Sequence, residues 1–478
     1  MMDINKNKSK LTVMKFGGSC LSDKNSFSQI SSIIKKYLNQ SKIIIVTSAL
    51  KGITDKLIEY YLKSSEKENN SIIILDEILL IHTNLINQLF AGNEEYKNKA
   101  LKFLRESGSE LMQLGKVINL LRPSKNLQDI IASYGEKLST YMLKCYLDSL
   151  NFNAVFVSSD EIIMTDDNFG RALPLLEETE ALIKQKVIPF LTSESEKIIC
   201  VTGFYGSTRD RKITTLGRGG SDLTAAILAY SLRNDFDSKI VYWKDVKGFL
   251  NVDPKISTKT KILNHLSYIE AKELAFFGSK VLHPLCLDVA EKGNIPSEIR
   301  SFNEPESNEF TRISSEIIKD EKIIKAIASI YRLSMVTIES GTMISLPGTA
   351  SKLFSLLGAN DINIKFISQS SSENNITFGI DIEDSMKVSY LLRNSEFFGK
   401  QWFSIKIDND ISLISIIGAG MMHTPGIAGK IFTTLGNNGI NVKAIAQGSS
   451  ELNITVIIDR KDCKKAVNVL YDAFINQD

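Results

Sequence analysis

The chain has 478 residues, and its 57 lysines and arginines against 55 aspartates and glutamates give a formal net charge of +2 at pH 7. So small a net charge provides no general positive field, and we expect neither a nucleic-acid partner nor a membrane partner. The hydrophobic share of 43% with 23% charged residues is ordinary for a globular protein. No apolar run approaches the roughly 20 residues that span a bilayer, and the length allows about three domains.

The N-terminus and the cysteines indicate a reduced, cytoplasmic compartment. Residues 1–10 are polar and rich in lysine and asparagine, so we expect a disordered tail there and not a secretory signal. Five widely spaced cysteines cannot all pair with one another. The four histidines are scattered too, so we expect no dedicated metal ligands. The cysteines are Cys20, Cys145, Cys200, Cys286 and Cys463, and the histidines are His82, His265, His283 and His423.

Apolar strand patterns alternate with helical patterns over the first 280 residues or so. Such alternation predicts an α/β fold with a mostly parallel open sheet and helices on both faces. Ligands of such sheets bind outside the carboxyl ends of the strands, where glycines and small polar residues gather in this chain. The expected strands cover residues 11–16, 42–46, 154–157, 197–201 and 239–243, and two of the expected helices cover residues 133–150 and 221–231.

A repeat follows a compositional change near residues 302–320. Few apolar residues occur there, so we place a linker at residues 306–324, after a domain that covers residues 11–305. Residues 325–478 then contain two similar segments about 78 residues apart, around residues 333–383 and 411–460. Each reads strand, Pro-Gly turn, helix, strand, strand, which predicts a pair of small α+β modules rather than a longer repeat array.

Two glycine-containing segments carry the candidate chemistry. Residues 215–222 (TLGRGGSD) precede an alanine-rich helix, and glycines there would let backbone N–H groups approach an anion at the helix N-terminus. Arg218 within this loop is a fork donor suited to a carboxylate or phosphate. Lys15 precedes the second segment, residues 15–19 (KFGGS), and could reach phosphate oxygens across the turn. Alone, the first segment could equally be a capped helix after a tight turn, and it is not a Walker A sequence. Alone, the second segment would favour a solvated lysine at a strand end.

In combination these motifs resemble those of the aspartate kinases, and the C-terminal repeat is similar to their tandem ACT regulatory domains. The resemblance extends from about Leu11 to the end of the chain. Its motifs occur in the family's order at residues 15–19, 48–54, 135–136, 214–222, 245–254 and 277–284. The resemblance implies the amino-acid kinase fold, a three-layer α/β sandwich, followed by two ferredoxin-like ACT domains.

The implied reaction transfers phosphate from ATP to the side chain of L-aspartate and gives 4-phospho-L-aspartate, the first step toward lysine, threonine and methionine. The implied catalytic residues are Lys15, Asp222 and Lys280. Arg218 would bind the α-carboxylate of aspartate and Glu136 its α-ammonium, in a pocket completed by Thr54, Phe204 and Ser221. The nucleotide would contact Lys15, Gly17, Gly18, Ser48, Lys244, Asp245, Asp253, Lys255 and Lys280.

The chemistry of this reaction fits the residue types independently of the resemblance. A side-chain carboxylate is already ionised at neutral pH, so the nucleophile needs no general base such as histidine. The reaction needs two anions positioned and the charge on the γ-phosphoryl group neutralised by lysines, backbone amides and Mg²⁺ held on the phosphates. Three departures from the family pattern put nucleotide affinity in question: Cys20 after Ser19, Lys244 in place of a small hydroxyl residue, and Lys255 in place of arginine.

The ACT resemblance implies feedback inhibition by an amino acid, and we expect threonine. Lysine-inhibited relatives have an aspartate where this chain has Lys365, or Lys443 in the second copy, and a lysine there would repel a lysine effector. ACT domains commonly pair across subunits, so we expect a homodimer or a dimer of dimers. The candidate effector-binding residues are Gly348, Thr349, Ala350, Asn363, Ile364, Gln369, Gly426, Ile427, Ala428, Asn441, Val442 and Gln447.

Two other functions stay open from the sequence. The chain could be another phosphotransferase of the amino-acid kinase fold, acting on glutamate or a nucleotide, or a catalytically inactive amino-acid sensor. The presence of Lys15, Glu136, Arg218, Asp222 and Lys280 favours an enzyme over a sensor. Because Asp478 follows the second module directly, we expect a monofunctional enzyme without the homoserine dehydrogenase to which threonine-sensitive relatives are often fused.

Overall fold

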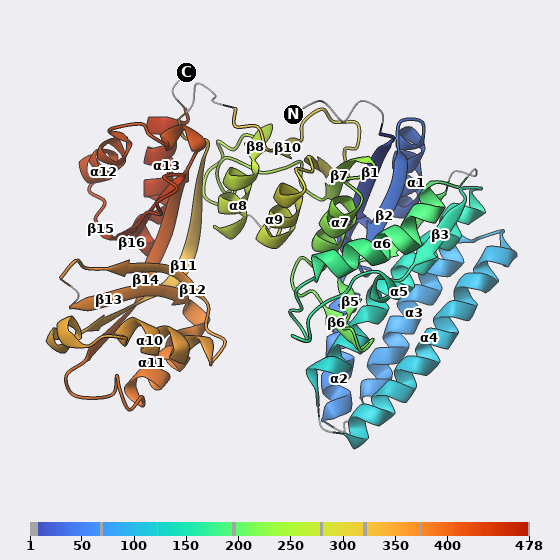
Figure 1. Cartoon of the computed structure of the whole chain (residues 1–478), viewed down its shortest axis with the longest axis horizontal. Coiled ribbons are helices and arrows are strands. Elements are labelled where there is room, and N and C mark those ends of the chain that lie inside the picture. The colour runs from blue at the N-terminus through green and yellow to red at the C-terminus, as the bar shows by residue number, and fades with distance from the viewer. Residues whose placement is uncertain are drawn as a thin grey trace. The chain divides into compact units, whose positions relative to one another are not determined.

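The chain forms two compact units, shown with their elements in Figure 1. The computed structural model describes residues 8–66, 70–121, 123–193, 197–277, 281–318, 323–372 and 374–476. The first unit comprises Met1–Gly248, Asn264–Tyr268 and Val281–Glu316. The second comprises Phe249–Leu263, Ile269–Lys280 and Ile317–Asp478.

An eight-stranded sheet forms the centre of the first unit. Its order is β3-β4-β2-β1-β7-β9-β10-β8, and all neighbours are parallel except β9 and β10. The strands are β1 (Lys10–Phe16), β2 (Lys42–Thr47), β3 (Ala154–Val157), β4 (Ile198–Thr202), β7 (Asp237–Lys244), β8 (His265–Ser267), β9 (Ser297–Ser301) and β10 (Thr311–Ser314). A separate antiparallel pair joins β5 (Tyr205–Ser207) to β6 (Ile213–Thr215). The expected mostly parallel sheet is confirmed.

Helices cover both faces of this sheet, so the predicted three-layer fold is also confirmed. Met14 and Phe16 of β1 belong to the large core cluster that also contains residues of α1 (Lys24–Leu38) and α5 (Lys125–Ser149). Successive side chains of a strand point to opposite faces, so Lys15 points away from that cluster. On its side lies α7 (Gly220–Ser231), which contacts β1, β2, β7, α6 (Leu176–Leu191) and α9 (Pro284–Lys292).

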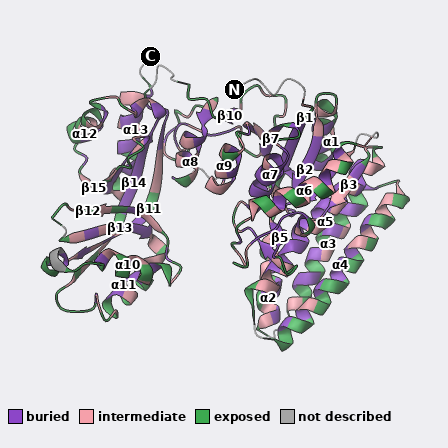
Figure 2. Cartoon of the chain, viewed as in Figure 1, coloured by how far each residue is buried: buried purple, intermediate pink, exposed green. Residues whose placement is uncertain are grey.

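Three long helices, α2 (Ile53–Ser65), α3 (Ser71–Leu89) and α4 (Glu94–Leu120), extend this unit beyond α5. By length and composition alone, α3 could cross a membrane. This property was not predicted from the sequence, because Asp76 and Glu77 interrupt the apolar run of this helix. Core helices can pass the same test. One face of α3 packs into the core cluster and contacts α2 and α4, whereas residues of its other face are exposed (Figure 2).

The second unit contains a six-stranded antiparallel sheet in the order β12-β13-β11-β14-β16-β15. Each half has the predicted strand-helix-strand-strand order, followed by a further helix. The first module has β11 (Ala326–Glu339), α10 (Thr349–Gly358), β12 (Ile364–Gln369), β13 (Asn375–Asp381) and α11 (Ser385–Arg393). The second has β14 (Ser404–Ile417), α12 (Ile427–Asn437), β15 (Val442–Ala446), β16 (Asn453–Asp459) and α13 (Cys463–Phe474).

Two segments that precede the repeat in sequence pack with this second sheet. The backbone N–H of Ile327 in β11 donates to the Asn251 carbonyl at 2.8 Å, and Tyr471 of α13 accepts a hydrogen bond from the Asn251 side chain at 3.3 Å. The helix α8 (Tyr268–Phe276) follows with its buried Glu270, which pairs with Lys325 at 3.3 Å. The contacts therefore divide the chain differently from a single boundary near residue 306.

Smaller differences occur at the expected tail and linker. Residues 1–7 lie outside the described part of the chain, whereas Ser9 accepts a hydrogen bond from the backbone of Asp237 at 3.0 Å and Lys10 begins β1. Strand β10 falls within the expected linker at residues 306–324, because Thr311–Ser314 pairs with both β9 and β8. Alternate buried positions in a polar stretch are easily overlooked in a search for apolar runs.

Candidate active site and effector pocket

A buried cluster of two lysines and one aspartate lies at the carboxyl ends of β1 and β7. The ammonium of Lys15 lies 2.6 Å from Oδ1 of Asp222, and that of Lys244 lies 2.8 Å from Oδ2. The exposed side-chain fractions are 8% for Lys15, 14% for Lys244 and 7% for Asp222. One carboxylate thus holds two ammonium groups from neighbouring parallel strands.

The loop before α7 places Asp222 in the first turn of that helix. Gly219 is the N-cap residue at φ 74°, a left-handed conformation that favours glycine. A Cβ on Gly219 would lie 2.6 Å from the Cβ of His283, so the loop also needs glycine for its close approach to α9. The sequence therefore positions Asp222 by a turn that other residues would distort.

Burial and charge act against each other on these groups. Burial alone would raise the pKa of Asp222, but Lys15 and Lys244 hold this pKa below its ordinary value. Burial lowers the pKa of Lys244, the Asp222 carboxylate opposes that change, and Lys15 adds to it. Asp222 is therefore an anion at neutral pH.

Glu136 is a second buried carboxyl group of the first unit. Oε1 accepts a hydrogen bond from the backbone N–H of Ala49 at 3.0 Å, directly after β2. Oε2 is buried and has no hydrogen-bond partner within the described residues. Burial raises the pKa of Glu136 to about 8, although the Ala49 N–H and Lys15 favour its ionised form. The group is mostly protonated at neutral pH and has one oxygen available for a cationic ligand.

The small residues predicted to line the phosphates of the nucleotide lie in two turns at the same edge of the sheet. Gly17 and Gly18 directly follow β1, and a Cβ on Gly18 would lie 2.9 Å from the Ala49 carbonyl oxygen. The backbone N–H of Ser48 donates to the Phe16 carbonyl at 3.2 Å. Thr54 is half-buried in the first turn of α2. The fold therefore brings these turns against each other beside β1 and β2.

Phe204 and Ser221 both lie at the N-terminal end of α7, Phe204 against Gly220 and Ser221 in the first turn. Phe204 has φ 80°, which is unusual for a bulky side chain and marks backbone strain of a kind found at functional sites. Its N–H donates to Thr224 at 3.2 Å and its carbonyl accepts from Leu216 at 2.8 Å. Ser221 is 7% exposed. These hydrogen bonds hold the strained residue against the Arg218 loop.

Other predicted site residues are not part of this buried cluster. Arg218 and Asp245 are exposed in the first unit, and Arg218 makes no ion pair with any residue that the structure describes. Asp253 and Lys255 belong to the second unit, where the backbone N–H of Lys255 donates to Asp253 Oδ1 at 2.8 Å. Lys280 lies outside the described residues. The roles of these residues stay predictions.

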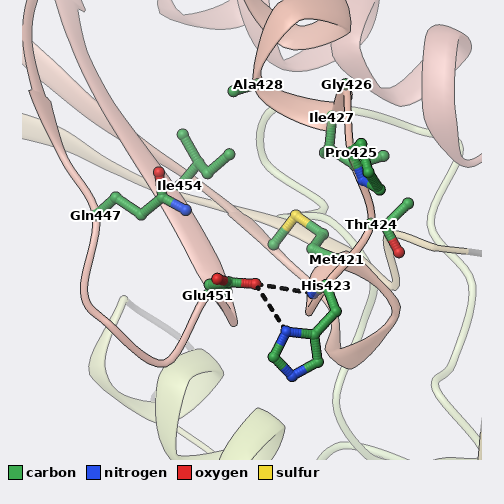
Figure 3. Close-up of a pocket in the computed structure, with 10 residues that line it drawn as sticks. All are labelled: Met421, His423, Thr424, Pro425, Gly426, Ile427, Ala428, Gln447, Glu451 and Ile454. Atoms are coloured by element: carbon green, nitrogen blue, oxygen red, sulfur yellow. Dashed lines mark hydrogen bonds and ion pairs between the residues drawn. The ribbon is translucent and has the colours of Figure 1, made fainter.

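A cavity of about 340 Å³ lies in the second ACT-like module (Figure 3). It brings together four predicted effector residues, Gly426, Ile427, Ala428 and Gln447. Glu451 accepts a hydrogen bond from the backbone N–H of His423 at 2.8 Å, and its carboxylate lies 3.8 Å from the imidazole. Other lining residues are Met421, Thr424, Pro425 and Ile454, whereas Asn441 and Val442 are not among them.

The corresponding residues of the first module occupy equivalent places in its fold. Gly348 caps α10 at φ 85°, as Gly426 caps α12 at φ 86°. Thr349 is buried and its hydroxyl donates to the Leu346 carbonyl at 2.9 Å. Ala350 follows in the same turn, Asn363 and Gln369 are exposed, and Ile364 begins β12. Their contacts with an effector stay predictions.

In each module, the lysine on which the expected choice of effector depends lies in a β-bulge. The register shifts at Lys365 between β12 and β13 and again at Lys443 between β15 and β16. Lys365 pairs with Asp381 at 2.9 Å, and Lys443 pairs with Asp459 at 2.6 Å and with Asp408 at 2.6 Å. The repeat therefore preserves an ion pair as well as a lysine.

Sequence reasoning missed several residues that shape these sites. It assigned Lys244 to the nucleotide but not to Asp222, from which 22 positions separate it. It also missed His423 and Met421 in the cavity. The left-handed backbone of His423, at φ 58°, has no sequence signature of the kind that glycine provides. The proximity of Pro425 and Gly426 was the one available signal for His423.

Comparison with known proteins decides the family. The model of the amino acid kinase family matches residues 10–301, and that of the ACT domain matches residues 336–394 and 414–474. Aspartokinase 3, chloroplastic, of Arabidopsis thaliana is 30% identical over 484 residues, which cover 99% of this chain and 84% of that protein. The chain belongs to the aspartokinases.

Longer relatives match as well. Bifunctional aspartokinase/homoserine dehydrogenase 1, chloroplastic, of A. thaliana is 30% identical over 472 residues, which cover 97% of this chain and 51% of that protein. The chain spans about half the length of such relatives.

Solved structures of Escherichia coli aspartokinase III are similar over nearly the whole chain. Its complex with aspartate and ADP has a TM-score of 0.79 at 25% identity and covers 97% of this chain and 99% of that one. Its complex with lysine and aspartate has a TM-score of 0.81 at 25% identity and covers 98% and 100%. The predicted fold, an amino-acid kinase domain followed by ACT domains, is thus confirmed for the chain.

Proposed function

We propose that the chain phosphorylates the side-chain carboxylate of L-aspartate with ATP. The observation that carries this proposal is the buried cluster of Lys15, Asp222 and Lys244, accompanied by the buried Glu136 in the same unit. Lysines suit the phosphates, and a carboxylate with a buried free oxygen suits an ammonium. The complex of E. coli aspartokinase III with aspartate and ADP supports aspartate and an adenine nucleotide as the ligands.

The transfer itself needs no proton movement. An oxygen of the aspartate side-chain carboxylate attacks the γ-phosphorus, the bond to the bridging oxygen breaks, and ADP leaves with the electron pair. Lys15 and Lys280 would neutralise charge on the transferring phosphoryl group, and Asp222 would orient the lysines. Glu136 would bind the α-ammonium, Arg218 the α-carboxylate, and Thr54, Phe204 and Ser221 the body of the substrate.

Mg²⁺ would arrive with the nucleotide. Among the described residues no group of three or more carboxylate, histidine or cysteine side chains could hold a metal ion. Asp222 alone suits a cation that keeps most of its ligands on phosphates and water. When bound, Mg²⁺ supplies positive charge to the phosphate oxygens. Gly17, Gly18 and Ser48 would line the phosphates, and Asp245, Asp253 and Lys255 would lie along the nucleotide.

The regulatory part of the proposal is inhibition by threonine. Asp381 and Asp459 already pair with Lys365 and Lys443, so neither offers an unpaired carboxylate to the ammonium of a lysine effector. Gln447 in the cavity of the second module is a neutral hydrogen-bonding group that suits a hydroxyl side chain. The lysine complex of E. coli aspartokinase III concerns a relative, and the effector can differ within one family.

Assembly through the ACT modules and a cytoplasmic location are also proposed. Ile367 of β12 and Ile445 of β15 are 48% and 45% exposed at equivalent positions of the two edge strands. Exposed apolar edge strands favour pairing with a second copy. The five cysteines are all unpaired and buried, which suits a reducing compartment.

An ADP-release assay with aspartate tests the function. We expect aspartate-dependent turnover that is lost in Lys15→Ala and Asp222→Ala, both of which should still bind threonine. Equal turnover in the variants would refute the assigned site, and no aspartate dependence in the wild type would refute the activity. Repeating the assay with threonine, lysine and methionine tests the effector, and strong inhibition by lysine with none by threonine would refute that part.

A further inference from the structure

The lysine-aspartate cluster carries an excess of buried positive charge. Lys15 and Lys244 bring two ammonium groups to the single carboxylate of Asp222, and all three side chains are at most 14% exposed. A one-to-one ion pair would already satisfy the carboxylate. Burying a second ammonium is costly unless an anion joins the cluster.

Within the described part of the chain, the buried and half-buried ionisable groups that act electrostatically on the cluster supply no such anion at neutral pH. Burial raises the pKa of Glu136 to about 8 and that of the Cys286 thiol to about 12, so both are mostly neutral at pH 7. The phenol of Tyr242, whose pKa burial raises further, is neutral too. His283 has a pKa lowered by burial and adds no negative charge in any state.

We propose that Lys244 is a phosphate-binding residue that provides part of the positive charge a divalent cation brings, so that nucleotide binds this chain with reduced dependence on Mg²⁺. The proposal rests on the proposed kinase function and deepens it. Lys244 ends the strand adjacent to that of Lys15, so both ammonium groups can exchange the Asp222 carboxylate for phosphate oxygens at the same sheet edge. Asp222 then holds the lysines in the empty site and shares them with the polyphosphate in the filled one.

Lys244 differs from a surface lysine near the site because its side chain is largely buried. A surface lysine attracts phosphate weakly because water and salt screen it. Lys247, three residues along, is 31% exposed and pairs with Glu304 and Glu309 at 2.9 and 2.8 Å. Lys247 therefore provides a matched control of the same type from the same segment, with its charge already balanced.

The test is calorimetric titration of ADP into the full chain, once in Mg²⁺ and once in EDTA, for the wild type, Lys244→Met and Lys247→Met. We expect the wild type to bind ADP in EDTA and Lys244→Met to bind it at least about tenfold more weakly there, with a smaller loss in Mg²⁺. Lys247→Met should match the wild type in both conditions. An unchanged affinity of Lys244→Met in EDTA, or no detectable ADP binding to the wild type in EDTA, would overturn the inference.

A conservative variant separates charge from packing. Lys244→Arg keeps the positive charge and should retain most of the binding in EDTA, whereas a purely structural role would make it as poor as Lys244→Met. Equal losses of Lys244→Met in Mg²⁺ and in EDTA would likewise contradict the proposal. Aspartate-dependent ADP release is measured separately on the wild type, so that failure of the kinase reaction is distinguished from failure of the Lys244 inference.

Discussion

The raised pKa of Glu136 predicts that aspartate binding strengthens with pH. The α-ammonium of aspartate needs the ionised carboxylate, but with a pKa of about 8 only about a tenth of the empty site is ionised at pH 7. The apparent affinity for aspartate at pH 7 should therefore be about tenfold below its limit at high pH, and kcat/KM for aspartate should rise about tenfold per pH unit from pH 6 to 7.

The same shift predicts a stability effect that can be measured without substrate. The folded-state pKa lies above the ordinary value of 4.5, so the folded protein retains a proton that the unfolded chain releases. This contribution to stability is complete below pH 4.5 and is lost as the pH rises to about 8. Between pH 5 and 7 the loss is about 2 to 3 kcal/mol.

Glu136→Gln removes the titrating group and supplies the comparison. Urea unfolding at pH 5, 7 and 8 should show a smaller decline in the free energy of unfolding for this variant than for the wild type. The exposed Glu110, which accepts a hydrogen bond from Tyr134 at 2.7 Å, is a control whose glutamine variant should keep the wild-type decline. Calorimetry at pH 7 in two buffers should show nearly one proton released per aspartate bound. Flat aspartate kinetics between pH 6 and 8, with no proton release, would refute the reasoning.

Three further changes have defined outcomes. Arg218→Lys should raise KM for aspartate at least about tenfold, because lysine lacks the two parallel N–H donors with which a guanidinium group binds a carboxylate. The melting temperature should not change because Arg218 is exposed, and an unchanged KM would remove Arg218 from the substrate site. Gly203→Ala would place a Cβ 2.6 Å from the Cβ of Ser221, so urea unfolding should show a loss of about 1 to 3 kcal/mol, and full stability would contradict that contact. Glu270→Ala leaves Lys325 buried without this partner and should lower the free energy of unfolding by about 3 to 5 kcal/mol, whereas a loss below 1 kcal/mol would show that the pair is dispensable.

The fold was largely predictable because local patterns and tertiary packing agree. Strand β3 has the bounds expected from the sequence, since apolar periodicity and turn residues coincide there. The order of residues along the chain did not predict which distant segments pack together. Asn251 hydrogen-bonds to Ile327 and lies beside Tyr471, so residues 249–263 pack with the second unit although their motifs belong to the kinase sequence. A boundary drawn once along the chain cannot represent that arrangement.

At the candidate site too, the sequence identifies which types of residue are present but not which residues contact one another. The sequence alone identifies Lys15 and Asp222 as charged residues beside glycine-containing turns. Such turns are recognisable because their backbone conformation or close packing requires glycine. It cannot show that Lys244 shares the Asp222 carboxylate, since the contact depends on strand β7 lying next to β1 and on both side chains facing α7. Nor can it show that Glu136 is mostly protonated, because that state follows from burial and not from residue type. The charge balance of the site is therefore a property of the packed sheet, and measurements that vary pH and divalent cation test it more directly than substitution of the motif residues alone.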